Sequence, residues 1–147
     1  GFKVDDRELV LLNNIRPEAI VEKKFITLRK EDKFRKLSDA FLVTDQTVFP
    51  VLNEERRLTG LVYIDDVKSI LLKEEVFDKT IISDVMVKPQ YTISVKDDIQ
   101  KIMRLFDLSG LWVIPVVQTD GSFIGFADKR KLLGLLRETL TTHHLLN

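Results

Sequence analysis

The sequence predicts an α/β protein in which one unit of α+β type occurs twice, and three observations support this fold class. Pro50 and Pro115 each lie within an apolar run, at an offset of 65 residues. Gly60 and Gly125 repeat that offset, without a gap, at the start of a second apolar run. Within each copy, short stretches with strand character are followed by stretches in which apolar residues have helical spacing. We therefore expect two similar domains in tandem.

The first part of each copy is expected to contain a short strand and a helix. The strands are predicted at residues 25–28 and 91–93. The acidic pairs Glu31-Asp32 and Asp97-Asp98 predict helix starts, because carboxylates stabilise the positive end of the helix dipole. Ser109-Gly110 is expected to end the second helix. Each helix has one apolar face, formed by Phe34, Leu37 and Phe41 in the first copy and by Ile99, Ile102, Met103 and Phe106 in the second.

The second part of each copy is expected to contain two strands and a closing helix, which gives the order β-α-β-β-α. The strands are predicted at residues 47–52 and 58–64 in the first copy and at 111–117 and 123–127 in the second. The closing helices bury Val67, Ile70 and Leu71, and Leu132, Leu133, Leu136 and Leu140. The predicted organisation is an N-terminal linker at 1–16, one domain at 17–72, a charged connector at 73–81, a second domain at 82–141 and a tail at 142–147.

Pro50 and Pro115 lie early in their predicted strands. Proline has no N–H group, so it is expected where a strand needs no ladder bond, for example where its backbone faces a cleft. The alternative is that both prolines simply mark the starts of strands.

The overall composition excludes several classes of protein. The 147 residues include 44% apolar side chains, enough for a compact core. Lys and Arg total 23, as do Asp and Glu, so nucleic acid is not an expected partner. The absence of cysteine excludes disulfides and thiolate zinc sites and favours a reducing compartment. No apolar run approaches the roughly 20 residues of a membrane span, so we expect the chain itself to be soluble.

The order of elements, the apolar-Pro-Val segments and the Gly-apolar-apolar segments resemble the cystathionine-β-synthase-type (CBS) domain over about residues 17–140. Two such domains in tandem resemble a Bateman module. The resemblance implies two halves related by a pseudo-twofold axis and packed sheet to sheet. It also implies two clefts of the kind that commonly hold adenine nucleotides or S-adenosylmethionine.

A narrower resemblance concerns the cytosolic C-terminal module of bacterial CLC-type chloride channels and transporters. It rests on residues 49–55, 58–61, 64–67, 82–86, 112–116 and 124–126. This resemblance implies a regulatory module at the cytoplasmic face of a membrane, covalently attached to a transmembrane domain that this sequence lacks.

The nucleotide signature of the family is Gly-apolar-apolar-Ser/Thr-x-x-Asp, and the first copy matches it in part. The resemblance assigns Asp66 to the ribose hydroxyls, whereas Tyr63 stands where the signature has a hydroxyl residue that caps the helix. Asp65 could take over as the cap. The alternative is that Asp65 and Asp66 only stabilise a helix N-terminus, by some tenths of a kcal/mol to about 1 kcal/mol each.

The second copy departs further from the signature. Lys131 stands at the position of the ribose-binding aspartate, and an ammonium group cannot accept a hydrogen bond. Asp128 is a good N-cap, but its charge opposes a phosphate. The basic run at 129–131 could attract an anion or simply be a solvated helix start. We therefore expect unequal clefts, with one weak nucleotide site through Asp66 or none.

The candidate ligand-binding residues are spread over both copies. They are Thr27, Phe49, Pro50, Asp65, Asp66, Thr92, Ile114, Pro115, Asp128 and Lys131. The hydroxyls of Thr27 and Thr92 could reach a ligand, although threonine is also simply common in strands. Trp112 could stack on an adenine ring, but packing in a core or dimer interface is favoured. His143 and His144 are expected in a frayed tail.

These features favour a regulatory module over an enzyme. The chain lacks cysteine, its two histidines lie near its C-terminus, and no Gly-rich phosphate loop is present, so we expect neither catalysis nor a required cofactor. AMP, ADP or ATP is the possible ligand. An alternative to the chloride transporter is an adenylate sensor that is free-standing or attached to an enzyme or another transporter. Leu132, Leu133, Leu135, Leu136 and Leu140 exceed one narrow stripe and predict a homodimer surface.

Overall fold

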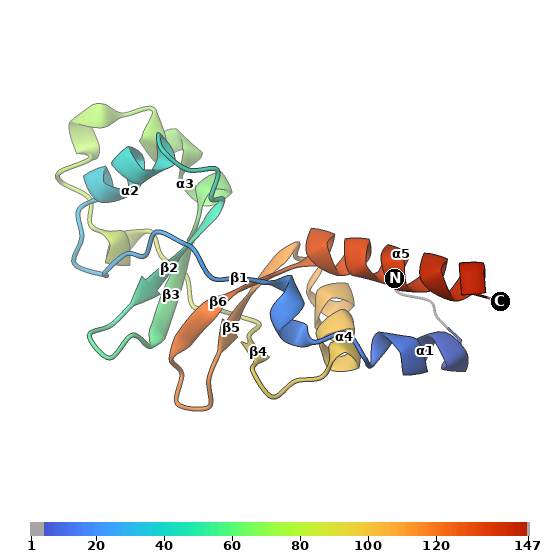
Figure 1. The fold of residues 1–147 in the computed structure, drawn as a ribbon. Coiled ribbons are helices and arrows are strands. Elements are labelled where there is room, and N and C mark those ends of the chain that lie inside the picture. The colour runs from blue at the N-terminus through green and yellow to red at the C-terminus, as the bar shows by residue number, and fades with distance from the viewer. Residues whose placement is uncertain (1–4, 147) are drawn as a thin grey trace. The chain divides into compact units, whose positions relative to one another are not determined.

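The computed structural model describes residues 5–146, with side chains described through residue 141, and shows a mixed α+β fold. The chain forms two compact units (Figure 1). Unit 1 contains the described residues up to 23, residues 91–119 and those from 124 onward. Unit 2 contains residues 24–90 and 120–123. Residues 17–23, predicted as part of the first domain, therefore belong to unit 1 with most of the second copy, and residues 82–90, predicted as part of the second domain, belong to unit 2.

Unit 1 has a four-stranded sheet with the order β1-β6-β5-β4. Strand β1 is antiparallel to β6, and β4 is parallel to β5. Its elements are α1 (Asp6–Leu12), a 3-10 turn (Pro17–Ile20), β1 (Val21–Glu22), β4 (Ile93–Ser94), α4 (Ile99–Ser109), β5 (Val113–Val117), β6 (Phe123–Asp128) and α5 (Lys129–Leu146). The second copy thus has the predicted order β-α-β-β-α.

Helix α4 begins and ends where the sequence predicts. The Asp98 side chain accepts a hydrogen bond of 2.9 Å from the Lys101 amide and caps the N-terminus. Gly110 ends the helix at a φ of 68°, a left-handed conformation that glycine adopts without steric cost. The inward faces of α4 and α5 meet the sheet in one core, which includes Leu12, Ile93, Ile99, Ile102, Phe106, Ile114, Val116, Leu132 and Leu136.

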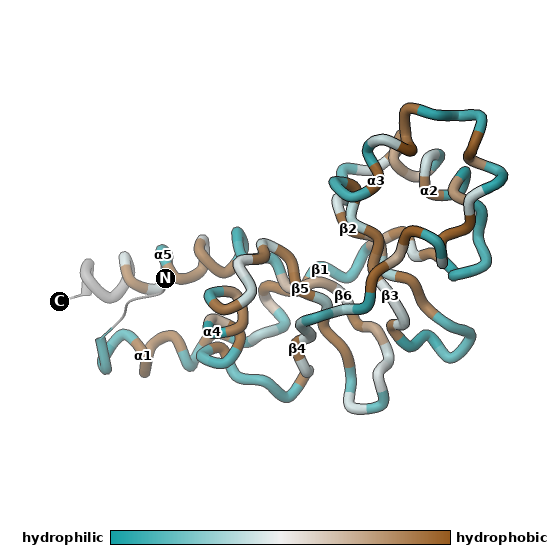
Figure 2. The backbone as a smooth tube through the Cα atoms, turned by 180° about the vertical axis from the view of Figure 1, so that it is seen from behind, coloured by the Kyte–Doolittle hydropathy of each residue, from teal (hydrophilic) through white to brown (hydrophobic). Residues whose placement is uncertain are grey.

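Unit 2 is built on a two-stranded antiparallel sheet with two helices. Its elements are α2 (Phe34–Phe41), β2 (Val48–Leu52), β3 (Leu58–Tyr63), α3 (Ile64–Leu71) and two 3-10 turns (Glu74–Val76 and Ile82–Asp84). The apolar β2 and the hydrophilic turn at residues 53–57 that follows it contrast in Figure 2. The core of this unit includes Leu28, Phe34, Leu37, Phe49, Val51, Val62, Val67, Phe77 and Ile82.

The predicted helix start at Glu31-Asp32 is wrong. Helix α2 begins at Phe34, and the Asp32 carboxylate instead accepts the Arg29 amide at 2.7 Å, which closes a turn. Asp97 plays the same part in the other copy by accepting the Ser94 amide at 2.8 Å. Each aspartate also pairs with a lysine four residues on, at 3.2 Å for Asp32 and 2.9 Å for Asp97. The repeat therefore extends to matched polar contacts.

Pro50 lies at the centre of β2 rather than at its start, and Gln46 compensates for its missing N–H. Leu28 and Val51 form a parallel bridge, the remnant of the strand predicted at 25–28. Farther back along this pairing, the Gln46 amide nitrogen donates to the Ile26 oxygen at 2.9 Å, and its oxygen accepts the Ile26 amide at 3.0 Å. The side-chain amide thus satisfies backbone groups beside the proline.

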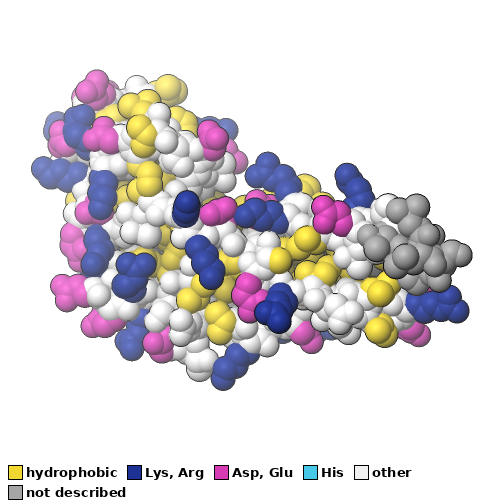
Figure 3. All heavy atoms as spheres, viewed as in Figure 1, with side chains coloured by type: hydrophobic (Ala, Val, Ile, Leu, Met, Phe, Trp, Pro, Cys, Tyr) yellow, Lys and Arg dark blue, Asp and Glu magenta, His cyan; other side chains and the backbone are white. Residues whose placement is uncertain are grey.

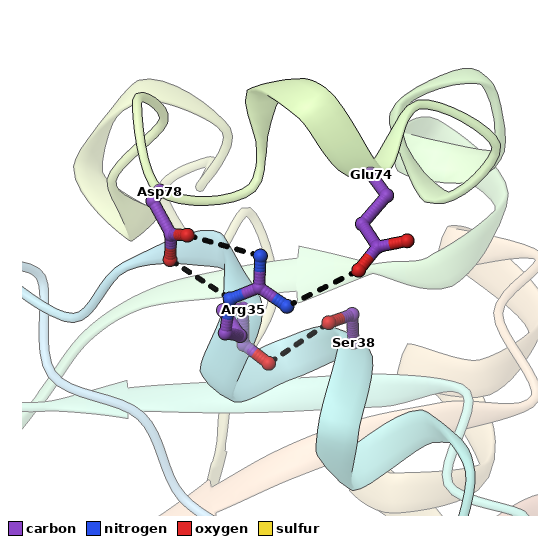
Figure 4. Close-up of polar contacts among 4 residues, drawn as sticks. All are labelled: Arg35, Ser38, Glu74 and Asp78. Atoms are coloured by element: carbon purple, nitrogen blue, oxygen red, sulfur yellow. Dashed lines mark hydrogen bonds and ion pairs between the residues drawn. The ribbon is translucent and has the colours of Figure 1, made fainter.

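The segment predicted as a charged connector packs against α2 (Figure 4). The Arg35 guanidinium donates two hydrogen bonds to the Asp78 carboxylate, at 2.9 and 3.0 Å, and lies 3.7 Å from a Glu74 oxygen. It also lies 5.5 Å from the ring centre of Phe77, which is buried in the core of unit 2. The forked donor geometry of arginine suits a carboxylate, so this contact fixes residues 74–78 on the helix.

The leucines of α5 divide between the core and the surface. Leu132 and Leu136 are buried in unit 1, Leu135 packs against that core, and Leu133 is 36% exposed. The homodimer surface stays a prediction. The helix continues to Leu146, beyond the predicted start of a tail at residue 142, while the side chains of His143 and His144 lie outside the described residues. On the face shown in Figure 3, cationic and anionic side chains are interspersed.

We expect Asp78→Asn to lower the melting temperature at neutral pH and to lose this effect in acid. The hydrogen bond from Arg35 holds the pKa of Asp78 below its usual 3.8. A carboxylate with a lowered pKa stabilises the fold above the pKa of the unfolded chain, and this contribution disappears as the pH falls through the folded value. Thermal unfolding between neutral pH and about pH 2 measures the difference, with Asp45→Asn on the exposed loop before β2 as the control. An equal deficit at every pH would contradict the prediction.

We expect Arg56→Gly to raise the free energy of unfolding by up to about 1 kcal/mol. Arg56 has a φ of 63°, while Gly121, its equivalent in the second copy, has a φ of 89°. Glycine removes the steric cost of this conformation, although it also increases the entropy of the unfolded chain. Chemical denaturation tests this against Glu55→Gly, which carries only the entropic cost and is expected to destabilise.

Candidate functional site

Unit 1 contains a cavity of about 220 Å³ between its sheet, helix α4 and the segment at residues 17–23. Most of the side chains that surround it are apolar. They are Pro17, Glu18, Val21, Lys23, Ile93, Ser94, Val95, Ile102, Val116, Ile124 and Ala127.

The apolar part of the lining comes from elements that also form the core. Ile93 lies on β4, Val116 on β5 and Ala127 on β6, and all three are buried. Ile102 of α4 is 1% exposed and belongs to the same core cluster. Three strands and a helix therefore place one rigid apolar surface around the cavity.

The polar part of the lining is small and lies at exposed positions. Glu18 and Lys23 are exposed and carry opposite charges, while Ser94 is half-buried. An apolar interior with a few polar groups is the usual composition of a small-molecule site. The arrangement suits a flat apolar ring inside and hydrogen-bonding or charged groups outside.

The wall at residues 17–23 lies against the sheet because position 125 is glycine. Val21 pairs with Ala127, and Glu22 pairs with Phe126. A Cβ atom at Gly125 would collide with the Glu22 carbonyl oxygen and would lie 2.9 Å from a methyl carbon of Val21. The wall is also tied to α5, because Lys131 Nζ lies 3.0 Å from a Glu22 carboxylate oxygen.

The equivalent place in unit 2 is bridged by backbone hydrogen bonds. The Ile82 amide donates to the Asp32 oxygen at 2.8 Å, and the Ser83 amide donates to the Lys30 oxygen at 2.9 Å. At the repeat offset of 65, Pro17 corresponds to Ile82 and has no N–H to donate. The first of these bonds is therefore impossible in unit 1. The segment at residues 17–23 in unit 1 therefore differs in its backbone hydrogen bonds from the equivalent segment at residues 82–88 in unit 2.

None of the predicted ligand-binding residues lines this cavity. Phe49 and Ile114 are fully buried in the two cores, and Pro50 and Pro115 are buried as well. Val116, the neighbour of Pro115 in β5, faces the cavity instead, because successive side chains of a strand point to opposite faces. Thr27 is half-buried and Thr92 is exposed.

The predicted helix cap at Asp65 is wrong. Helix α3 starts at Ile64, and its N-cap residue Tyr63 makes no side-chain capping bond. Asp65 lies in the first turn, is 85% exposed and pairs with Lys68 at 2.8 Å. Asp66 is exposed nearby. Burial, and secondarily the charge of Asp66, raises the pKa of the Tyr63 hydroxyl.

The two candidates at the start of α5 make internal contacts. The Asp128 carboxylate accepts the Arg130 amide at 2.8 Å, the bond expected of an N-cap. Lys131 forms the ion pair with Glu22. Trp112 is 54% exposed and is therefore not packed in a core. Lys129 Nζ lies 4.9 Å from the centre of its ring.

The sequence analysis missed the segment at residues 17–23 as part of a site. The signal was present, because the same offset aligns Pro17 with Ile82 and Lys23 with Lys88. This alignment alone does not indicate a site, because the sequence does not show that residues 17–23 pack on the sheet of the second copy.

Two further classes of site find no support in the part of the chain that the structure describes. Among the side chains of residues 5–141, no cluster of three or more acidic or histidine groups is arranged to hold a metal ion. In the same range, no helix combines the length and apolar character needed to cross a bilayer.

A model of the CBS domain family matches residues 18–73 and 82–138, which cover more than half of the sequence. The chain belongs to the CBS domain family. CBS domain pairs are typically regulatory rather than catalytic.

Individual proteins resemble this CBS pair at low sequence identity. Homoserine O-acetyltransferase of Methanococcus vannielii is 28% identical over 115 residues, which are 78% of this chain, and the match spans only 23% of that enzyme. The structure of CbpB in complex with c-di-AMP is 13% identical, with a TM-score of 0.77 over 96% of this chain and 97% of that one.

A second similar structure is the CBS domain pair of protein MJ0100 in complex with 5′-methylthioadenosine and S-adenosyl-L-methionine. It is 15% identical, with a TM-score of 0.68 over 84% of this chain and 97% of that one. At these identities the structural similarity establishes the fold alone.

We expect Gly125→Ala to destabilise the CBS pair by about 1–3 kcal/mol, because the added methyl group meets backbone atoms that cannot move without displacing β1. Gly60→Ala is the matched control, since Gly60 holds the equivalent position in the first copy. A Cβ atom there would lie 2.8 Å from the Met86 sulfur, at the flexible end of a side chain. Chemical denaturation should give a clearly smaller loss for Gly60→Ala, and equal losses would contradict this explanation.

Proposed function

We propose that this CBS pair is a ligand-sensing regulatory module, and that its ligand is an adenine nucleoside or nucleotide bound in the cavity of unit 1. The observation that carries the proposal is the cavity itself, with an apolar interior and charged residues at exposed positions. The CBS structures described above contain c-di-AMP, 5′-methylthioadenosine and S-adenosyl-L-methionine, which share an adenosine group.

The size and lining of the cavity suit the base and part of the sugar of such a ligand. Its volume of about 220 Å³ is below the roughly 300–1,000 Å³ of sites that enclose a whole drug-sized molecule. A purine ring would contact the apolar strand residues and gain roughly 25 cal/mol for each Å² of apolar surface removed from water. The remainder of the ligand would then extend toward Glu18 and Lys23.

Glu18 and Lys23 would each bind a different polar group of the ligand. The Glu18 carboxylate is an acceptor for ribose hydroxyls, a role that Lys131 cannot take because its ammonium group only donates. Lys23 is a donor for a phosphate or carboxylate. The proposal thus places the site in the second copy of the repeat, whereas the sequence alone favoured Asp66 in the first.

Regulation requires that the ligand bind two arrangements of the protein with different affinity. In this proposal the difference arises at the wall formed by residues 17–23, which a bound ligand would contact directly. The wall is continuous in sequence with helix α1, which packs on α5 within unit 1.

Two hosts for this module are proposed, and each has its own support. A membrane anion transporter is favoured by the similarity to CLC-type modules at residues 49–55, 58–61, 64–67, 82–86, 112–116 and 124–126. The match to part of a homoserine O-acetyltransferase favours attachment to an enzyme. The sequence that flanks this module in the full-length protein decides between them.

A ligand panel tests the proposed function. Adenosine, AMP, ATP, 5′-methylthioadenosine, S-adenosylmethionine and c-di-AMP are compared by thermal shift and calorimetry. A ligand at 100 times its dissociation constant stabilises a single site by about 2.7 kcal/mol, or roughly 5–10 °C for a chain of this size. We expect at least one adenosine compound to reach this range.

Matched lysine variants locate the binding site. Lys23→Ala should weaken binding of anionic ligands about two- to fivefold, the range of an exposed charge contact. Lys88→Ala, at the equivalent position of the first copy, should leave the affinity unchanged. Binding that is lost in Asp66→Ala or Lys88→Ala, but kept in Lys23→Ala, would place the site in unit 2 and contradict the proposal.

A further inference from the structure

We propose that the Glu22–Lys131 ion pair is a positioning contact for the cavity, which holds its wall on the sheet and thereby sets the affinity for ligand. This inference rests on the proposed function, because it concerns regulation of the same site. It also assigns a role to Lys131, whose ammonium group stands where the resemblance to nucleotide-binding CBS domains leads one to expect a ribose-binding aspartate.

The pairing of the wall with the sheet is short at residues 21–23, whereas Ile20, earlier in the wall, is buried in the core of unit 1. Strand β1 contains only Val21 and Glu22, and each forms one register pair with β6. A strand this short contributes little by itself, since most strands have about five residues. Gly125 permits the close approach but offers no side chain against which the wall could pack. An additional contact from outside the sheet therefore helps to hold residues 21–23 in place.

Glu22 is well placed to act on the cavity without lining it. Its neighbours in sequence, Val21 and Lys23, both line the cavity. Lys131 lies in the first turn of α5, three residues after the end of β6. The 3.0 Å ion pair thus joins the C-terminal part of the wall to the helix that follows β6. Movement of Glu22 away from Lys131 would carry Val21 and Lys23 with it.

The expected effect is modest and sensitive to salt. The Glu22 and Lys131 side chains are 47% and 42% exposed, so water and ions screen their attraction. Exposed ion pairs of this kind change an equilibrium by up to about fivefold. A contact of that strength can adjust affinity, whereas it is too weak to decide whether the domain folds.

Charge reversal provides the test in the full chain. Glu22→Gln and Lys131→Met each remove the pair, and the double variant with Glu22→Lys and Lys131→Glu restores it with opposite polarity. Lys101→Met is the control, because it removes another ion pair of unit 1, 2.9 Å to Asp97, that does not involve the wall. AMP and 5′-methylthioadenosine are the probes, and calorimetry gives their affinity.

Hydrogen exchange at the amides of residues 21–23 in the absence of ligand gives a second readout. We expect each single variant to weaken binding about two- to fivefold and to accelerate exchange at these amides by a similar factor. The charge-reversed pair should recover both quantities, and Lys101→Met should change neither. High salt should weaken binding by the wild type but have less effect on Glu22→Gln.

Unchanged exchange at residues 21–23 in the single variants would overturn the positioning role. Faster exchange with unchanged affinity would overturn the link between the wall and ligand binding. If neither probe binds the wild type, the proposed function fails for these ligands, and the exchange data alone decide whether the ion pair holds the wall. The two failures are thus distinguishable.

Discussion

Backbone atoms of Glu22 lie so near the Cα of Gly125 that no side chain fits between them. This close approach brings residues 17–23 onto the sheet of unit 1, and with them Pro17, Glu18 and Lys23, which face the cavity. A larger residue at position 125 would move the segment outward and change the shape of the enclosure. The chemistry of the site therefore depends on the absence of a methyl group.

The same constraint has a different outcome in each copy of the repeat. Gly60 accepts the Met86 side chain, while the amides of Ile82 and Ser83 bond to the loop before α2. The sequence of unit 1 prevents the first of those bonds, because proline replaces Ile82. Gln46 adds another difference. Its side-chain amide completes the backbone pairing beside Pro50, whereas the equivalent residue in the second copy is Leu111, whose side chain cannot form hydrogen bonds. Changes at a few positions thus give two copies of one fold different internal surfaces.

The sequence predicted the fold well because local signals determine most of it. The apolar periodicity of α4, the cap at Asp98 and the left-handed Gly110 act over a few residues, and the structure confirms each of them. The helix start at Glu31-Asp32 was wrong because an aspartate that caps a helix and one that closes the preceding turn look alike in sequence. Only the position of the Asp32 oxygen against the Arg29 amide distinguishes them.

The candidate site was harder to predict, because its wall comes from a segment outside the copy that supplies the other residues. Register along the strands added a second difficulty. Pro115 and Val116 are adjacent, yet only Val116 faces the cavity, so a motif identifies the strand without identifying the side chain that meets a ligand. The substitution of lysine for aspartate at position 131 indicated a departure from ribose recognition. The role proposed for Lys131 could be inferred only from the structure, which places Glu22 beside it.

The placement of the wall also limits how a bound ligand can act on the rest of a host protein. Four residues of the segment 17–23 line the site, and both this segment and α1 pack on α5 within the same unit. A ligand that favours the closed wall would thus stabilise one arrangement of the chain that leads into the module. The free energy available is the difference in ligand affinity between the two arrangements, typically about 1–3 kcal/mol. Ile20 anchors the wall in the core of unit 1. Residues 21–23 are held by two residue pairs and an exposed ion pair, a hold of comparable strength, so a small molecule can shift the equilibrium of this part of the wall.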